Sequence, residues 1–456
     1  MNSLSNIPFS ISSSKGYSTK NNDSELLNMF VHIEEAGSKS NHILMNTEGA
    51  KLLATVSYEI YGTYEYDGVV YIATEKLLYE FNVSTKTFKS IGAVSFDSKV
   101  TFADNGIDIV IVGGGNGYAY TPSSGFLRNM DIHQGWYPAG TVCYMDGYFI
   151  FNRIGTGQFF ISRLYSTSID PIDWSTAEAA PDNTVAVVVS NRQLWLFGEK
   201  TIEIWYDSGN PDFPFTRING SVTDVGTANY KSISSLKENI YFVGNDFKVY
   251  MTLGYRPNRI STPAIEKRLS MCDPELLYGF SFINNGHSFY VIHIDNIYTY
   301  VYDKDTGQWH MRMSCDKRKW FIDGTIKINN SSELFGNSGS NFYSLSIEHY
   351  TEDGKPIRRE AISLPINKGV NRFILAEMQL DMETGFQAEG KVLLQLSDDG
   401  GVTWSNNHLA STGAVGDVKH RVRWLRLGQH RDCIVKIVIT DPIPIRILGL
   451  YARYGQ

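Results

Sequence analysis

Short runs of alternating apolar and polar residues recur along most of the chain. Each run ends at a tight polar or glycine-containing turn and is followed by a second, aromatic-rich run. A period of two is typical of β-strands, and these turn residues are the ones that hairpins require. The pattern predicts seven hairpins, at residues 69–81, 107–120, 148–164, 192–206, 239–251, 288–302 and 333–347.

The spacing of these hairpins, roughly 40 to 50 residues, is typical of four-stranded propeller blades. Helical periodicity is confined to one candidate, residues 263–277, which is expected to be a single inserted helix. The hairpins therefore predict an all-β chain with a β-propeller of six or seven blades. Early strands at 27–34 and 42–45 are expected to close one blade, and this leaves the blade count open by one.

The pattern changes near residue 355, where a series of longer strands with polar turns begins. Strands at this spacing predict a C-terminal antiparallel β-sandwich of about 100 residues. The expected division is an N-terminal arm at 1–22, a propeller at 23–355 and a sandwich at 356–456. The expected sandwich strands are 372–381, 390–396, 419–427, 433–440 and 443–451.

Composition agrees with a β-rich chain, because aromatic residues make up 13% of the 456 residues and 40 glycines stand against 14 prolines. The net charge of −7 and the lack of a long basic run argue against tight, non-specific binding of nucleic acid. No apolar run is long enough to span a membrane, and the N-terminus lacks the pattern of a signal peptide. The four cysteines are widely spaced, which predicts buried, reduced thiols folded in a reducing cytoplasm: Cys143, Cys272, Cys315 and Cys433.

Two glycine-containing motifs are structural in this interpretation. The glycines at 113–117 lack the third glycine and the following helix of a dinucleotide-binding fingerprint, so a hairpin turn is expected there. Residues 397–404 fit the Asp-box pattern of sialidase-like propellers, in which the carboxylate ties turn amides and the tryptophan packs beneath the hairpin. The expected turn residues are Ser397, Asp399, Gly401 and Trp404, and a looser version occupies 302–309.

No motif predicts catalysis. The histidines show no paired metal-ligand spacing, and the adjacent carboxylates are expected in turns or on the surface. We therefore expect no enzyme activity, no catalytic residue, no cofactor and no metal.

One local basic cluster stands out at 419–426. A strand there would place Arg421 and Arg423 on one face and Val422 and Trp424 on the other. The cluster is either a solvated strand face or an interface patch for an acidic partner. In the second case Arg421, Arg423 and Arg426 supply charge, and Trp424 is the anchor.

The order of motifs near the C-terminus resembles that of tail hub, or nozzle, proteins of short-tailed bacteriophages, also called packaged DNA stabilisation proteins. The motifs are residues 397–401, 421–424, 427–428, 431–432, 439–442 and 447–449. The segments 27–31, 37–40, 201–206 and 213–215 resemble the same family. The similarity extends over nearly the whole chain.

The resemblance implies a structural virion protein of the tail, made in the host cytoplasm. It would form a ring, a hexamer, beneath the portal and its adaptor, close the channel over packaged DNA and conduct that DNA during ejection. The implied partners are tail needle, plug or tailspike proteins, and the DNA would pass without sequence-specific contacts. A glycan-binding or glycan-cleaving, sialidase-like propeller of a phage tail is the alternative, and a cytoplasmic interaction propeller is the third hypothesis.

Overall fold

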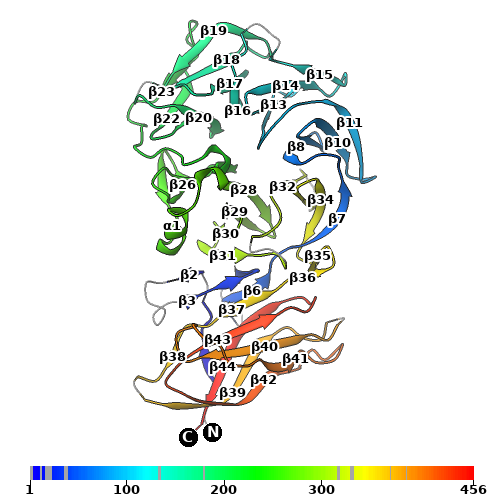
Figure 1. The fold of residues 1–456 in the computed structure, drawn as a ribbon, viewed down its shortest axis with the longest axis vertical. Helices are drawn as coiled ribbons and strands as arrows, with labels where there is room; N and C mark the ends of the chain where they lie inside the picture. The colour runs from blue at the N-terminus through cyan, green and yellow to red at the C-terminus, as the bar shows by residue number, and fades with distance from the viewer. Residues whose placement is uncertain are drawn as a thin grey trace.

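The computed structural model describes ten stretches of the chain, residues 4–10, 13–15, 23–34, 40–131, 135–177, 180–315, 319–328, 333–369, 371–386 and 388–455. Strands make up 56% of the protein and helices 3%. Figure 1 shows a ring of small sheets above a second, elongated domain that contains both chain termini. The predicted fold, a β-propeller followed by a β-sandwich, is confirmed.

Within the described residues the ring has seven four-stranded antiparallel blades. Each predicted hairpin forms the central pair of strands of one blade. The first four blades are β8 (Ile60–Tyr66), β9 (Val69–Thr74), β10 (Leu77–Asn82) and β11 (Thr87–Ala93); β12 (Thr101–Asp104), β13 (Ile109–Gly113), β14 (Asn116–Thr121) and β15 (Phe126–Asn129); β16 (Ala139–Met145), β17 (Tyr148–Arg153), β18 (Gln158–Ser162) and β19 (Ile169–Thr176); and β20 (Thr184–Ser190), β21 (Gln193–Gly198), β22 (Ile202–Asp207) and β23 (Phe215–Arg217).

The remaining three blades complete the ring. They are β24 (Ser234–Leu236), β25 (Asn239–Val243), β26 (Val249–Leu253) and β27 (Arg256–Arg259); β28 (Tyr278–Asn284), β29 (His287–Ile294), β30 (Tyr298–Asp303) and β31 (Gln308–Arg312); and β32 (Gly324–Lys327), β33 (Leu334–Ser338), β34 (Asn341–Ser346) and β7 (Gly49–Thr55).

Blades pack face to face through apolar side chains. Among the described residues, seven clusters of buried apolar residues each lie between two neighbouring blades. The cluster between the last blade and the first contains Phe81 and Phe342, whose ring centroids are 4.9 Å apart. The abundant aromatic residues fill the wedge between blades, because large flat side chains bury the most area there.

The last blade is closed by an N-terminal strand. β7 supplies its outer strand by pairing antiparallel with β34, which comes almost 300 residues later in the sequence. The expectation that strands at 27–34 and 42–45 close the propeller is wrong, because β5 (Met29–Ile33) and β6 (His42–Asn46) instead join the sheet of β44 (Arg446–Tyr454).

The C-terminal domain is a sandwich with one apolar core. One sheet contains β39 (Phe373–Met382), β42 (Val422–His430), β44, β6 and β5, with β1 (Ser5–Ile7) at the edge of β44. The facing strands are β37 (Arg359–Ile362), β43 (Asp432–Ile439), β40 (Lys391–Ser397) and β41 (His408–Ser411), and β38 (Ile366–Asn367) pairs with β43. The division at 23 and 356 stays a prediction, but the pairing places β5 and β6 with the sandwich.

The N-terminal segment also joins the two domains. β4 (Leu26–Leu27) pairs parallel with β31 of the sixth blade and antiparallel with β37 of the sandwich. The sixth blade and one sandwich sheet are therefore a continuous ten-stranded sheet. Parts of the expected N-terminal arm, residues 1–3, 11–12 and 16–22, lie outside the described residues. Its β1 is paired, and β2 (Ser14–Lys15) pairs with β3 (Asp23–Ser24).

Two further expectations need correction. The helix predicted over 263–277 is a short α1 (Pro263–Leu269), and a separate 3-10 turn, η2 (Pro274–Leu276), follows it. A second 3-10 turn, η1 (Tyr230–Ser232), precedes β24. The short strands β35 (Thr351–Glu352) and β36 (Lys355–Pro356) extend the last blade.

The expectation for the cysteines also needs correction. All four cysteines are free thiols, but Cys315 is exposed and not buried as expected. None of the helices in the described stretches is long and apolar enough to cross a membrane.

A buried ion pair holds the junction of the two domains. Arg312 Nη1 lies 2.8 Å from Glu48 Oε2, and the exposed fractions of the two side chains are 2% and 3%. Arg312 Nη2 also donates to the Glu48 carbonyl, and the guanidinium stacks 3.5 Å from the centre of the Trp320 ring. The second Glu48 carboxylate oxygen accepts from Asn284. The last residue of the sixth blade is therefore fixed to the chain segment that enters the closing strand.

We predict that Glu48→Gln lowers the free energy of unfolding by about 3 kcal/mol, because it removes the carboxylate that pairs directly with the buried Arg312 guanidinium. The midpoint of urea denaturation measures the change. Glu80→Gln, which breaks the solvent-exposed pair with Lys89, is the control and should cost less than about 1 kcal/mol. Equal, small effects in both variants would show that the buried pair does not hold the junction.

Candidate functional site

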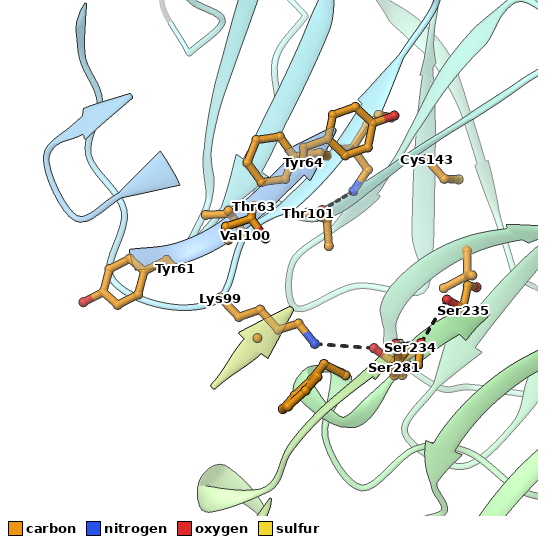
Figure 2. A pocket seen from close by; sticks show the side chains of 18 of the residues that line it. Tyr61, Thr63, Tyr64, Lys99, Val100, Thr101, Cys143, Ser234, Ser235 and Ser281 are labelled. Atoms are coloured by element: carbon orange, nitrogen blue, oxygen red, sulfur yellow. Dashed lines mark hydrogen bonds between the residues drawn. The ribbon is translucent and has the colours of Figure 1, made fainter. Parts of the chain in front are cut away.

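The propeller encloses a central cavity with a volume of about 680 Å³. The innermost strands of all seven blades contribute to its wall. The wall combines aliphatic side chains, such as Val142 and Val188, with hydroxyl and aromatic groups, among them Tyr64, Thr101 and Ser281. Figure 2 shows several of these side chains facing a common hollow. Such a surface offers hydrogen bonds to water or to a small polar molecule.

Lys99 crosses this cavity at one end (Figure 2). It precedes β12 of the second blade, and its Nζ donates to the carbonyl oxygens of Lys231 at 2.9 Å and Gly279 at 2.7 Å, on the far side of the ring. Nζ also lies 4.7 Å from the centre of the Tyr278 ring. Burial, and then the nearby charge of Lys231, lower the pKa of Lys99 from 10.5 to about 7. An amine that has lost one proton can still make both short hydrogen bonds.

A second, smaller cavity of about 350 Å³ lies beyond Lys99. The two cavities share Tyr61, Lys99 and Tyr278 in their walls. The Lys99 side chain therefore separates the central cavity from the smaller one. Cavities of this size hold small molecules. A cavity of this volume, spanned by Lys99, is too small to hold a nucleic-acid duplex.

The basic strand predicted over 419–427 is β42 (Val422–His430), so Arg421 lies just before its first residue. Arg421, Arg423 and Arg426 are exposed, and no ion pair of theirs is found among the described residues. Arg426 has a positive φ of 58°, at the place where the register between β39 and β42 shifts. The three guanidinium groups are thus available to a partner.

Trp424 requires a correction. Its side chain is 4% exposed and belongs to the sandwich core, and its Nε1 donates to the His408 carbonyl oxygen at 2.9 Å. The alternation along β42 assigned it to the face opposite the arginines, and that face is covered by the second sheet. Trp424 therefore stabilises the sandwich and is not an anchor for a partner.

The Asp-box turn follows β40. Asp399 accepts from the backbone N–H and the hydroxyl of Thr403 and from the Ser397 hydroxyl, and Ser397 in turn accepts from Gly401 N–H. These hydrogen bonds, that of the Thr403 hydroxyl first, lower the pKa of Asp399 from 3.8 to about 2. Gly401 has a φ of 90°, a conformation that side chains disfavour. The half-buried Trp404 ring faces Lys436 Nζ at 3.9 Å, so these contacts are those of a turn.

The looser motif at 302–309 lies in the sixth blade. The carboxylate of Asp303 accepts from Thr306 and contacts His287 Nδ1 at 2.7 Å. His287 Nε2 lies 2.9 Å from Nδ1 of His32, which is on β5 of the sandwich sheet. This chain of contacts is a second polar tie between the propeller and the sandwich.

The comparisons with known proteins decide the family. The sequence matches the family model described as Bacteriophage P22 Gp10, beta-propeller, over residues 7–322, and the model for the beta-sandwich of the same protein over residues 358–455. The chain belongs to the Gp10, or packaged DNA stabilisation, family of short-tailed bacteriophages. It is therefore a structural phage tail protein and a component of the virion.

The similarity of this chain to solved structures is low. A chain in a crystal structure of the mitotic checkpoint complex is 12% identical, with a TM-score of 0.42 over 69% of this Gp10-family chain and 96% of its own. The computationally designed Ika8 protein is 13% identical, with a TM-score of 0.41 over 71% of this chain and 99% of its own. No curated protein matches the chain significantly.

The alternative of a glycan-binding or glycan-cleaving propeller stays a prediction. The surface that comes nearest to it is an open hollow of about 710 Å³ lined by Tyr144, Tyr165 and Asp207, among others. In it Arg192 already pairs with Asp146 at 2.7 Å.

No sequence motif marks Lys99 as a site residue, although in this Gp10-family propeller its side chain crosses one end of the central cavity. We predict that Lys99→Met removes a pH dependence of stability. Because the pKa is lowered, the folded protein binds fewer protons than the unfolded chain between about pH 7 and 10.5, so the free energy of unfolding rises with pH across this window. Unfolding with urea at several pH values measures the slope, which should be shallower in the variant.

Lys267→Met, on the exposed side of α1, is the matched control and should keep the wild-type slope. Identical slopes in wild type and Lys99→Met would show that the amine titrates at its ordinary pKa.

Proposed function

We propose that the protein forms the tail hub, or nozzle, ring below the portal and its adaptor. Such a ring would retain packaged DNA and conduct it during ejection. The observation that carries this proposal is the match of both domains to the Gp10 family, over residues 7–322 and 358–455. The ring is proposed to be a hexamer that contacts the tail needle, plug or tailspike proteins.

The geometry supports a role that needs no chemistry. A propeller closed by its own N-terminal strand is rigid, and it presents broad faces for a heterologous interface that repeats by rotation. Because Lys99 interrupts the propeller channel, the DNA conduit in this proposal is the space enclosed by the ring of subunits. The net charge of −7 suits a lumen that repels phosphate.

The exposed arginines of β42 are proposed to face protein and not DNA. Three unpaired cations on one strand edge suit an acidic surface of a neighbouring subunit or tail protein. In this arrangement the lumen of the ring is neutral or acidic. A map of the assembled ring with a continuous basic lining would overturn this part of the proposal.

Electron microscopy of negatively stained particles tests the function. The purified protein is mixed with a portal–adaptor complex, and rings that cap its narrow end are expected. Particles that stay monodisperse and never attach would contradict the proposal.

We further predict that replacing Arg421, Arg423 and Arg426 together by glutamate abolishes attachment or ring formation, because like charges then meet across the interface. Sedimentation velocity measures assembly, and thermal unfolding checks that the exposed substitutions leave the fold intact. The control reverses three exposed charges on the propeller, at Lys51, Arg256 and Lys267. Retained assembly in the β42 variant, or equal loss in the control, would remove β42 from the interface.

A further inference from the structure

Three potential metal ligands meet at one end of the sandwich. Asp398 follows β40, His430 ends β42 and Cys433 lies near the start of β43. One ligand atom of each residue, a carboxylate oxygen, an imidazole nitrogen and the thiol sulfur, lies within 4.8 Å of the other two. The cluster is separate from the propeller cavity and from the exposed arginines.

The hydrogen bonds of His430 fix which of its nitrogens carries a proton. Nε2 lies 3.0 Å from the Leu427 carbonyl oxygen, which can only accept, so Nε2 carries the hydrogen. Nδ1 lies 2.6 Å from Asp398 Oδ1. In the neutral imidazole Nδ1 is therefore an acceptor that faces a carboxylate oxygen. Either a proton, carried by one of the two groups, or a metal ion lies between the two atoms.

We infer that Asp398 Oδ1, His430 Nδ1 and Cys433 Sγ form a zinc site. A thiolate, an imidazole and a carboxylate are the ligand set that Zn²⁺ prefers, and a water molecule would complete the tetrahedron. A zinc-binding histidine characteristically donates its other ring N–H to a backbone carbonyl, as His430 does to Leu427.

The surroundings suit a bound cation. Asp398 is 61% exposed and gives an ion a path from solvent, whereas His430 is 8% exposed and the thiol of Cys433 is buried. Binding would release the proton of the Cys433 thiol, because the thiolate is the form that binds the metal.

Zinc would change the local geometry only slightly. Bonds of about 2.0 to 2.3 Å place tetrahedral ligands roughly 3.5 Å apart. Nδ1 and Oδ1 would therefore separate by about 1 Å, through rotation of the exposed Asp398 side chain. The ion would then clamp the Asp-box turn to the turn that joins β42 in one sheet to β43 in the other.

The test uses the full chain, stripped with a chelator and titrated with Co²⁺ and then with Zn²⁺. We expect one Co²⁺ per chain, with a thiolate-to-cobalt charge-transfer band in the near ultraviolet, and displacement of that band by one equivalent of Zn²⁺. Absence of the band at saturating Co²⁺ would overturn the proposal and leave His430 and Asp398 as a proton-bridged ion pair.

Variants assign the ligands. Asp398→Asn, on an exposed side chain, should weaken binding at least about tenfold while the protein stays folded. Cys433→Ser should lose the charge-transfer band, and Cys272→Ser, at another buried cysteine, should keep it. A band that survives Cys433→Ser, or unchanged affinity in Asp398→Asn, would refute the site. Because Asp398→Asn changes only an exposed residue, the proposal stays testable even if Cys433→Ser fails to fold.

Discussion

The polar contacts between the N-terminal segment and the late part of the chain are the constraint on which the rest of the structure depends. Glu48 meets Arg312 in a nearly water-free junction, and the strand that follows Glu48 completes the last blade. Just before it, β4 lies between the sixth blade and the sandwich. A short stretch therefore closes the propeller and attaches the second domain. A buried charge pair favours one arrangement, since any slip of register would leave each charge unpaired in an apolar setting.

Closure of the propeller also determines what the molecule can do alone. The seven blades leave a cavity of small-molecule size, and Lys99 ties opposite sides of it together. In the proposed assembly the propeller is therefore a rigid building block, and the space for DNA comes from the way copies of the chain are arranged. The exposed arginines at β42 lie on the sandwich. The propeller and the sandwich therefore have different roles in the proposed assembly.

Local pattern was enough to predict the hairpins and the sandwich strands, because alternation and turn residues are properties of neighbouring positions. The sheet that each strand joins, and the face of it that is covered, were harder to predict. The strand at 42–46 alternates well and was expected to close the propeller, but alternation does not say which sheet a strand joins. Trp424 was correctly placed opposite the arginines, yet the sequence did not tell which face the second sheet covers. Lys99 is buried by blades that lie 132 to 180 residues away, and such burial has no local signal.

The pairing of early strands with late ones also constrains synthesis. β4, β5, β6 and β7 leave the ribosome first, but their partners β31, β34, β37 and β44 leave it only after most of the chain has been made. Neither the ring nor the sandwich can be finished until translation is nearly complete, so β4, β7 and the outer edge of the β5–β6 hairpin wait for their partners for much of that time. Contacts that span so much sequence slow folding, and exposed strand edges favour aggregation. The same closure that makes the finished subunit rigid leaves the nascent chain open to aggregation until its last strands are made.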